Sequence, residues 1–288
     1  MKKIIILIPV YNDWDSLKKL IQEISDVIKS FSNIVFECLI VNDASTNQRP
    51  EIKKPEQFNS IEILNMKENR GHARCNAFGI RYIVQNKVFD NLILMDGDGE
   101  DRPIEIKSLV EKINMDPETS VIAKRIKRSE GIIFKSLYQI HKIITFIFTG
   151  ENINFGNYCI LTRSDVEKLH KKASLWSSFS GTVKRNIKIL NEVNSIRGTR
   201  YFGPSKMSLI KLIIHSFSII AVFKYQVFLR STFFLFFLAF LNFYLGSLTI
   251  FLQIIIVIFN LIIYIVSKRE KELDLINSHL NLKDVKTI

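Results

Sequence analysis

The chain contains little cysteine and no pattern that would pair its cysteines. Cys38, Cys75 and Cys159 are scattered through 288 residues, without a CxxC pair or a metal-ligand spacing. A disulfide framework requires closely spaced cysteines in even number, and a cysteine zinc site requires paired ones. Both kinds of protein are excluded, and the polar part of the chain is expected in a reducing compartment with each cysteine buried as a small apolar residue.

Ionisable residues are absent from one long segment. The 37 residues from Ser231 to Ser267 include no acid, base or histidine, and Phe, Leu and Ile dominate them. A membrane-spanning helix needs about 20 apolar residues, so the segment predicts two spans, with Gly246 and Ser247 in the turn between them. A wholly soluble, fibrous or disordered protein is excluded. The rest of the chain is long enough for one sizeable globular domain.

Acidic residues are the minority charge, since 28 Asp plus Glu stand against 40 Lys plus Arg, a net charge of +12. Basic residues precede the first predicted span (Lys224, Arg230) and follow the second (Lys268, Arg269, Lys271), and the turn has none. This distribution places the globular part and both termini on the cytoplasmic side. The membrane explains the excess positive charge, and aromatic residues do not alternate with the basic ones, so no nucleic-acid partner is predicted.

The N-terminal apolar run, residues 4–8, is too short for a secretion signal and fits a buried strand. Similar runs recur at 35–41, 61–64 and 92–95, and residues of helical period lie between them. Continuous apolar strands that alternate with helices indicate a mainly parallel, Rossmann-like α/β sheet with flanking helices. Such sheets bind ligands at the carboxyl ends of their strands.

A third kind of segment lies between the globular part and the spans. Its polar residues form a narrow stripe on an otherwise apolar helix: Ser208, Lys211, His215 and Ser218. We expect an interfacial helix in the headgroup region, the alternative being an ordinary core helix. The predicted organisation is a globular domain over 1–206, a juxtamembrane helix over 207–226, a two-helix transmembrane hairpin over 227–267 and a cytosolic tail over 268–288.

An acidic turn follows the predicted strand at 92–95. It places four carboxylates in six residues, on Asp96, Asp98, Glu100 and Asp101. These repel one another unless a cation neutralises them, and hard oxygens at this spacing suit Mg²⁺ or Mn²⁺ holding a diphosphate. An EF-hand is excluded, because Asp101 stands where its glycine is required. The alternative is a solvated acidic turn that caps the next helix.

Four motifs occur in one order along the chain: Ile8-Pro9-Val10-Tyr11-Asn12-Asp13, Val41-Asn42-Asp43-Ala44-Ser45, Glu68-Asn69-Arg70-Gly71-His72 and Asp96-Gly97-Asp98. Taken alone, the second fits an ordinary Asx turn. The ordered set resembles the family 2 glycosyltransferases over about residues 3–206. The resemblance implies a GT-A fold, a nucleotide-sugar donor and sugar transfer with inversion.

The same resemblance implies roles for single residues. The donor-binding set would be Pro9, Tyr11, Asp13, Asp43, Asn69 and Asp96, with Asp43 accepting from the uracil or ribose. Asp96 and Asp98 match the family's DxD motif, and Glu100 stands where the polyprenyl-phosphate branch often has a metal-binding Gln. The implied metal ligands for Mg²⁺ or Mn²⁺ are therefore Asp96, Asp98 and Glu100. His72 could touch the diphosphate or simply begin a helix.

A last motif points to the acceptor. Arg200-Tyr201-Phe202-Gly203-Pro204-Ser205-Lys206 resembles the R-x-x-G-x-S-K stretch of dolichol-phosphate mannose synthases and bacterial polyprenyl-phosphate glycosyltransferases. Arg200, Ser205 and Lys206 would hold the acceptor phosphate, and Asp98, Arg200 and Lys206 would be catalytic. Arginine supplies a planar fork for phosphate oxygens and lysine a mobile charge. The alternative is a basic pair in a solvated loop.

Two departures and one further basic loop accompany these motifs. Asn157 stands where the branch often has an acid, and Ala44 stands where the second motif usually has glycine. A basic loop would either grip phosphates or face anionic lipid: Lys124, Arg125, Lys127 and Arg128. An acceptor phosphate is already anionic near neutral pH, so loss of the acid at Asn157 is compatible with a polyprenyl phosphate acceptor.

The sequence thus favours a membrane-anchored enzyme that moves a sugar from a nucleotide donor to a polyprenyl phosphate on the cytoplasmic face. One alternative is a transferase that extends a lipid-linked saccharide or glycolipid at a hydroxyl. Another, of a different class, is a non-catalytic membrane module that binds nucleotide sugars. Self-association through the two spans stays open.

Overall fold

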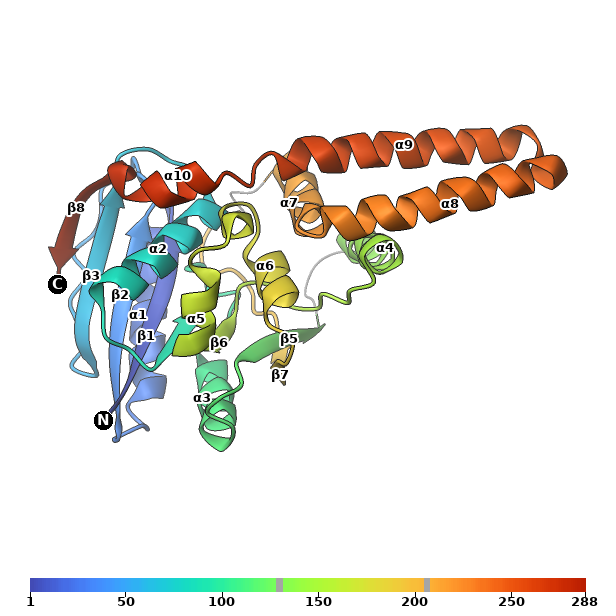
Figure 1. Ribbon diagram of the computed structural model, residues 1–288. Helices are drawn as coiled ribbons and strands as arrows, with labels where there is room; N and C mark the ends of the chain where they lie inside the picture. The colour runs from blue at the N-terminus through green and yellow to red at the C-terminus, as the bar shows by residue number, and fades with distance from the viewer. Residues whose placement is uncertain (128–131, 205–207) are drawn as a thin grey trace.

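The computed structural model describes residues 1–127, 132–204 and 208–288, and an eight-stranded sheet forms its centre (Figure 1). The strands are β1 (Lys2–Val10), β2 (Ile34–Asn42), β3 (Phe58–Met66), β4 (Asn91–Leu94), β5 (Val121–Lys127), β6 (Cys159–Thr162), β7 (Asn191–Ile196) and β8 (Leu282–Thr287). Their order is β7-β5-β6-β4-β1-β2-β3-β8. The pairs β1–β2, β1–β4, β2–β3 and β5–β7 are parallel, whereas β6 and β8 run antiparallel to their neighbours.

Helices cover both faces of this sheet because the central strands are apolar on both. In β1, Ile4, Ile6 and Ile8 face one core and Ile5 and Leu7 the other. The first core includes α1 (Trp14–Ile28) and α3 (Ile106–Met115); the second includes α2 (His72–Asn86), α5 (Arg163–Leu169) and α6 (Phe179–Asn186). Each fully buried Ile or Leu contributes about 1.5–3 kcal/mol. The predicted α/β class is confirmed. The short helices η1 (Pro103–Glu105) and η2 (Ala173–Trp176) complete the connections.

The parallel register brings the predicted polar clusters to one edge of the sheet. Val10 pairs with Asn42 at the end of β2, and Leu7 pairs with Leu94 at the end of β4. The chain leaves these three strands at the same edge, so the segments after them, 11–13, 43–46 and 95–101, are neighbours. This is the arrangement that parallel strands with polar carboxyl ends predict.

A hairpin of two long helices projects from the globular body (Figure 1): α8 (Lys224–Leu245) and α9 (Ser247–Ser267). Among the described residues, two helices are long and apolar enough to cross a membrane, and only 11% of the apolar window of each is buried. Both begin or end within a residue or two of the predicted basic flanks. The hairpin therefore does not pack inside the soluble body.

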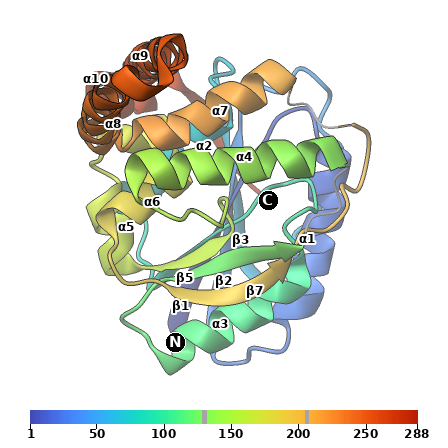
Figure 2. The same cartoon turned by 90° about the vertical axis from the view of Figure 1, so that its right-hand side faces the viewer.

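Two further helices lie between the sheet and the hairpin, side by side in Figure 2: α7 (Leu209–Ala221), which was expected, and α4 (Ile132–Thr149), which was not. They share a small apolar cluster with the hairpin through Ile144, Phe148, Phe217, Phe228 and Phe259. Their other faces expose large apolar side chains: Ile140, Ile143, Phe146, Ile210 and Ile213. A platform of two apolar helices thus connects the sheet to the hairpin.

The segment after α9, expected as a cytosolic tail over 268–288, is folded against the sheet. It forms α10 (Glu272–Ile276), η3 (Asn277–Asn281) and β8, and β8 adds an antiparallel strand to the edge of the sheet beside β3. Leu275 enters the core that α2 covers. Residues 268–288 therefore pack as part of the globular body. Their strand β8 satisfies the outer backbone groups of β3, which would otherwise form an unpaired sheet edge.

Candidate active site

The acidic turn follows β4 and is shaped by its own hydrogen bonds. The Asp96 amide donates to Asp101 Oδ2 (3.0 Å) and the Glu100 amide to Asp98 Oδ1 (3.0 Å). Gly99 has φ of 85°, and the Tyr201 ring occupies the space a side chain would need there. The turn is thus folded tightly against residues 197–201, and glycine is required at its centre.

Asp96 is held by two side chains that donate to the same oxygen. His72 Nε2 lies 2.9 Å and Asn157 Nδ2 3.1 Å from Asp96 Oδ1. Burial alone would raise the pKa of Asp96, but His72, Arg125 and Asn157 together outweigh it and hold that pKa well below its usual range. In return Asp96 raises the pKa of His72 against the opposing effect of burial. His72 begins α2 and contacts Asp96 of the acidic turn, and its contact with a diphosphate stays a prediction.

Arg200 joins the acidic turn to the end of β1. One of its terminal nitrogens donates to Asp98 Oδ2 at 2.9 Å and the other donates to Asp13 Oδ2. All three side chains are mostly buried, at 15% exposed for Arg200 and Asp13 and 19% for Asp98. The structure therefore brings together one predicted donor residue, one predicted metal ligand and one predicted acceptor residue.

Carboxylates still crowd the turn despite this arginine. Burial, then the charges of Asp96 and Glu100, raise the pKa of Asp98 to about 6. Burial and Asp96 raise the pKa of Asp101 to about 7, although Arg125 lies 3.8 Å away and opposes the shift. Arg125 belongs to the segment predicted as a basic loop, but Lys124, Arg125 and Lys127 lie in strand β5, which pairs with β7. Arg128 lies outside the described residues.

Arg197 is a site residue that the sequence analysis did not find. It donates to Glu100 Oε2, and the next residues bind the backbone of the turn: Gly198 N to Glu100 O (2.8 Å) and Tyr201 N to Asp98 O (3.0 Å). Its signal was its place three residues before the R-x-x-G-x-S-K stretch. Residues 197–201 thus lie across the acidic turn as a strap.

Asp43 has both carboxylate oxygens engaged by backbone amides. Arg70 N donates to Oδ1 (2.9 Å) and Gly71 N to Oδ2 (2.8 Å), and Asp43 is only 4% exposed. Gly71 has φ of 91°, a left-handed conformation that favours glycine, at the point where the chain turns from this carboxylate into α2. The second and third sequence motifs therefore form one unit at the edge of the sheet.

The remaining predicted residues surround this edge or lie outside the described part. Pro9 is buried at the end of β1, next to Val10, whose carbonyl accepts from Asp43 N (2.9 Å). Tyr11 is 39% exposed and Asn69 is exposed, so both are available to a ligand. Ser205 and Lys206 lie outside the described residues, so their acceptor role stays a prediction.

The fit of a divalent cation follows from the donor chemistry. The described residues contain no ready group of three or more acidic, histidine or cysteine ligands. Asp98 and Glu100 instead bind Arg200 and Arg197, while Asp96 and Asp98 offer hard oxygens whose mutual repulsion persists. These residues fit a hard cation if Arg200 and Arg197 release their carboxylates. Asp96, Asp98 and Glu100 stay the predicted ligands.

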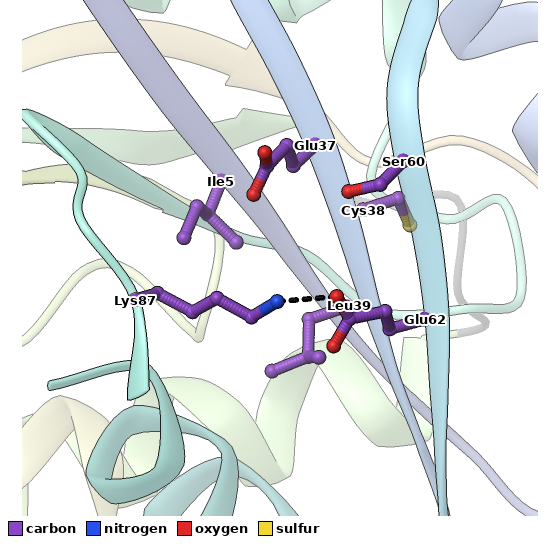
Figure 3. Close-up of a pocket in the computed structure, with 7 residues that line it drawn as sticks. All are labelled: Ile5, Glu37, Cys38, Leu39, Ser60, Glu62 and Lys87. Atoms are coloured by element: carbon purple, nitrogen blue, oxygen red, sulfur yellow. Dashed lines mark hydrogen bonds and ion pairs between the residues drawn. The ribbon is translucent and has the colours of Figure 1, made fainter. Parts of the chain in front are cut away.

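The structure has a small hollow far from this edge, shown in Figure 3. It lies among β1, β2, β3 and Lys87, and its residues are Ile5, Glu37, Cys38, Leu39, Ser60, Glu62 and Lys87. Its volume of about 10 Å³ holds at most one water molecule. Lys87 pairs with Glu62 inside it. The hollow therefore contains a structural ion pair and is too small to be a ligand site.

A mainly parallel sheet with an acidic turn at the end of β4 is the GT-A fold, and solved structures show the same architecture. Glucosyl-3-phosphoglycerate synthase from Mycobacterium tuberculosis, in complex with Mn²⁺, UDP-glucose and phosphoglyceric acid, superposes with a TM-score of 0.53 at 15% identity, over 78% of this chain and 80% of that one. Residues 1–349 of S. aureus TarS, in complex with UDP-GlcNAc, give 0.51 at 13% identity, over 85% and 73%.

The chain belongs to glycosyl transferase family 2, whose family model matches residues 5–179. Similar curated proteins include the undecaprenyl-phosphate 4-deoxy-4-formamido-L-arabinose transferases of Serratia proteamaculans (27% identical over 223 residues) and Yersinia enterocolitica (28% over 226 residues). Each alignment covers 74% of this chain and 65% of the relative. The chain thus matches somewhat less than two thirds of those relatives' length.

Proposed function

We propose that the protein is a membrane-anchored glycosyltransferase that moves a sugar from a nucleotide sugar to a polyprenyl phosphate, with inversion at the anomeric carbon. The observation that carries the proposal is the bridge from Arg200 to Asp13 and Asp98, because it joins the donor edge of the sheet to the segment that leads into α7. The names of the undecaprenyl-phosphate relatives support the same acceptor class.

The donor lies along the edge formed by the ends of β1, β2 and β4. Asp43, fixed by two amides, accepts from the nucleotide, and exposed Tyr11 and Asn69 border it. A divalent cation on Asp96, Asp98 and Glu100 would supply charge neutralisation for the leaving diphosphate. The chain's own part is to orient Asp96 through His72 and Asn157 and to offer the guanidinium of Arg200 to phosphate oxygens.

The acceptor reaches this edge from the platform of α4 and α7. Their exposed apolar side chains are suited to the boundary between headgroups and hydrocarbon. At this boundary the polyprenyl chain would lie in the hydrocarbon and its phosphate among the headgroups. A phosphate monoester has a second pKa of about 6, so it attacks without a general base near neutral pH. Asn157, which donates to Asp96 in place of an acid, is compatible with such an acceptor.

The topology proposal places the sheet and both termini on the cytoplasmic face. The pairing of β8 with β3 supports it, because the chain returns to the globular domain after the second span. Lys224 at the start of α8 also pairs with Glu270 just after α9 at 3.0 Å, so the two ends of the hairpin meet on the same side. Basic residues at this level favour the cytoplasmic leaflet.

The proposal is tested with radiolabelled nucleotide sugars, Mn²⁺ and short-chain polyprenyl phosphate added to membranes that contain the protein. We expect an acid-labile, lipid-soluble product. Asp98→Asn should abolish this product, whereas Asp26→Asn, a control on the exposed face of α1, should still form it. Product formed only with a lipid-linked saccharide would favour the hydroxyl acceptor. Nucleotide-sugar binding without any product would favour the non-catalytic module.

A further inference from the structure

The geometry points to Asn281 and Asp284, in the segment behind the second span, as positioning residues of the donor site. No sequence motif includes either residue. The inference rests on the proposed function in one respect, namely that Asp43 faces the donor nucleotide. Two separate hydrogen-bond routes lead from the C-terminal segment to Asp43 and its neighbours.

The first route runs through Asn281, which is 3% exposed. Asn281 forms hydrogen bonds with backbone groups of the loop before α2. Its carbonyl accepts from Lys67 N (2.8 Å), its Oδ1 accepts from Glu68 N (3.1 Å), and its Nδ2 donates to Glu68 O (3.0 Å). Both backbone groups of Glu68 are thereby satisfied by one side chain. Arg70 and Gly71, whose amides hold Asp43, follow within three residues.

The second route starts at Asp284 in β8. Asn65 Nδ2 donates to Asp284 Oδ1 (2.6 Å), Asn42 Nδ2 donates to Asn65 Oδ1 (2.9 Å), and Ser45 N donates to Asn42 Oδ1 (3.0 Å). An ionised carboxylate only accepts hydrogen bonds. Asp284 therefore fixes the side-chain amide orientation of Asn65, and Asn65 in turn fixes that of Asn42. As a result Asn42 directs its Oδ1 at the amide of Ser45, in the turn after Asp43.

These contacts give the folded tail a specific role. Pairing of β8 with β3 alone would cover a sheet edge with any sequence that can form a strand. Asn281 and Asp284 instead place side chains against the two loops that meet at Asp43. Figure 1 shows the tail crossing α2 and reaching the far edge of the sheet before the chain ends. The donor site is thus completed by residues that lie beyond the membrane hairpin.

The test compares Asn281→Ala and Asp284→Ala with Lys286→Ala, an exposed residue of the same strand. Loss of a buried hydrogen-bonded partner weakens a dependent site by about 5- to 10-fold. We expect the Kd for UDP with Mn²⁺, and the KM for the donor, to rise by that factor while kcat changes less than about twofold. Asp284→Asn keeps an acceptor oxygen for Asn65 and should restore most of the affinity.

Hydrogen exchange of the peptide that contains Arg70 and Gly71 provides a readout that needs no ligand. Faster exchange there in Asn281→Ala, with the peptides of β1 unchanged, is the expected result. Unchanged exchange and unchanged donor KM in both alanine variants would overturn the inference. Failure of the wild-type protein to bind UDP, GDP or CDP would contradict the proposed function, and the exchange measurement would still decide the positioning role.

Discussion

Arg200 lies 2.9 Å from Asp98 and donates at the same time to Asp13, so one guanidinium is shared between two carboxylates and leaves a net negative charge. A cation on Asp98 would have to replace this contact. Arg200 therefore competes with a cation for Asp98. Once a cation displaces it, the guanidinium of Arg200 is available to phosphate oxygens.

Replacing Arg200 should have opposite effects on catalysis and on metal binding. Arg200→Gln should lower turnover by about 100-fold, as for loss of one charge-stabilising donor. Without donor it should bind Mn²⁺ about three- to fivefold more tightly, because Asp98 no longer has a competing cation. Titration of Mn²⁺ by electron paramagnetic resonance measures this.

The matched control is Arg163→Gln, which removes an exposed arginine paired with Glu167 on α5. It should change neither quantity. Weaker Mn²⁺ binding by Arg200→Gln than by the wild type would show that Arg200 does not compete for the cation position.

Ala44 provides a stability prediction from backbone geometry. Its φ is 56°, a left-handed conformation that costs a residue with a Cβ about 1–2 kcal/mol, whereas glycine adopts it readily. Ala44→Gly should therefore stabilise the protein by about 0.5–1 kcal/mol, after the entropy cost of glycine is subtracted. Thermal unfolding of the detergent-solubilised protein measures the change.

Ala77→Gly in the buried part of α2 is the matched control, since the same substitution in a helix interior should lower stability by about 1 kcal/mol. A lower unfolding temperature for Ala44→Gly would show that the backbone at residue 44 is not strained.

His215 on α7 predicts an acid limit to stability. Burial lowers the pKa of His215 to about 4, helped by charges that face it from other elements: His72 at the start of α2, His141 on α4 and Arg125 on β5, with Asp96 opposing. The folded pKa lies below the unfolded value of about 6.5. The unfolded chain therefore binds the proton first, and stability present above pH 6.5 is lost as the pH falls toward 4.

His215→Gln removes the group that takes up this proton. The unfolding temperature of the variant should therefore fall less than that of the wild type between pH 6.5 and 4. One proton limits the difference in slope to about 1.4 kcal/mol per pH unit. Parallel pH profiles for the two proteins would contradict the lowered pKa of His215.

The topology is open to cysteine labelling because the native cysteines are buried, and burial raises the pKa of Cys38 to about 12. Ser247→Cys, in the exposed turn of the hairpin, should react with an impermeant maleimide added outside intact cells. Lys283→Cys, on β8, should react only after the cells are opened. The reverse pattern would contradict a cytoplasmic sheet.

The central sheet and the hairpin could be predicted because their signals are local. Ile4–Ile8 is buried on both faces of β1, and the segment from Ser231 to Ser267 is apolar throughout, so neither depends on knowing a distant partner. The acidic edge followed from the same strands, since parallel strands bring their carboxyl ends together.

The features that were missed depend on contacts between distant residues. In β8, Leu282 and Val285 are the apolar residues of a short edge strand, and its partner β3 lies more than 200 residues earlier. Among the described residues, Phe148 of α4 packs against α7 and the hairpin, elements more than 60 residues away in the chain. Arg197 gains its role only when residues 197–201 fold across the acidic turn.

Transfer of a sugar to the lipid phosphate can be measured by mass spectrometry of the products that the purified protein forms. With a nucleotide sugar, Mn²⁺ and a short-chain polyprenyl phosphate, we expect a lipid whose mass increases by one sugar residue on its phosphate, with one nucleoside diphosphate released per product. Nucleoside diphosphate release without sugar on the lipid phosphate, or a sugar linked only to a hydroxyl acceptor, would contradict this transfer.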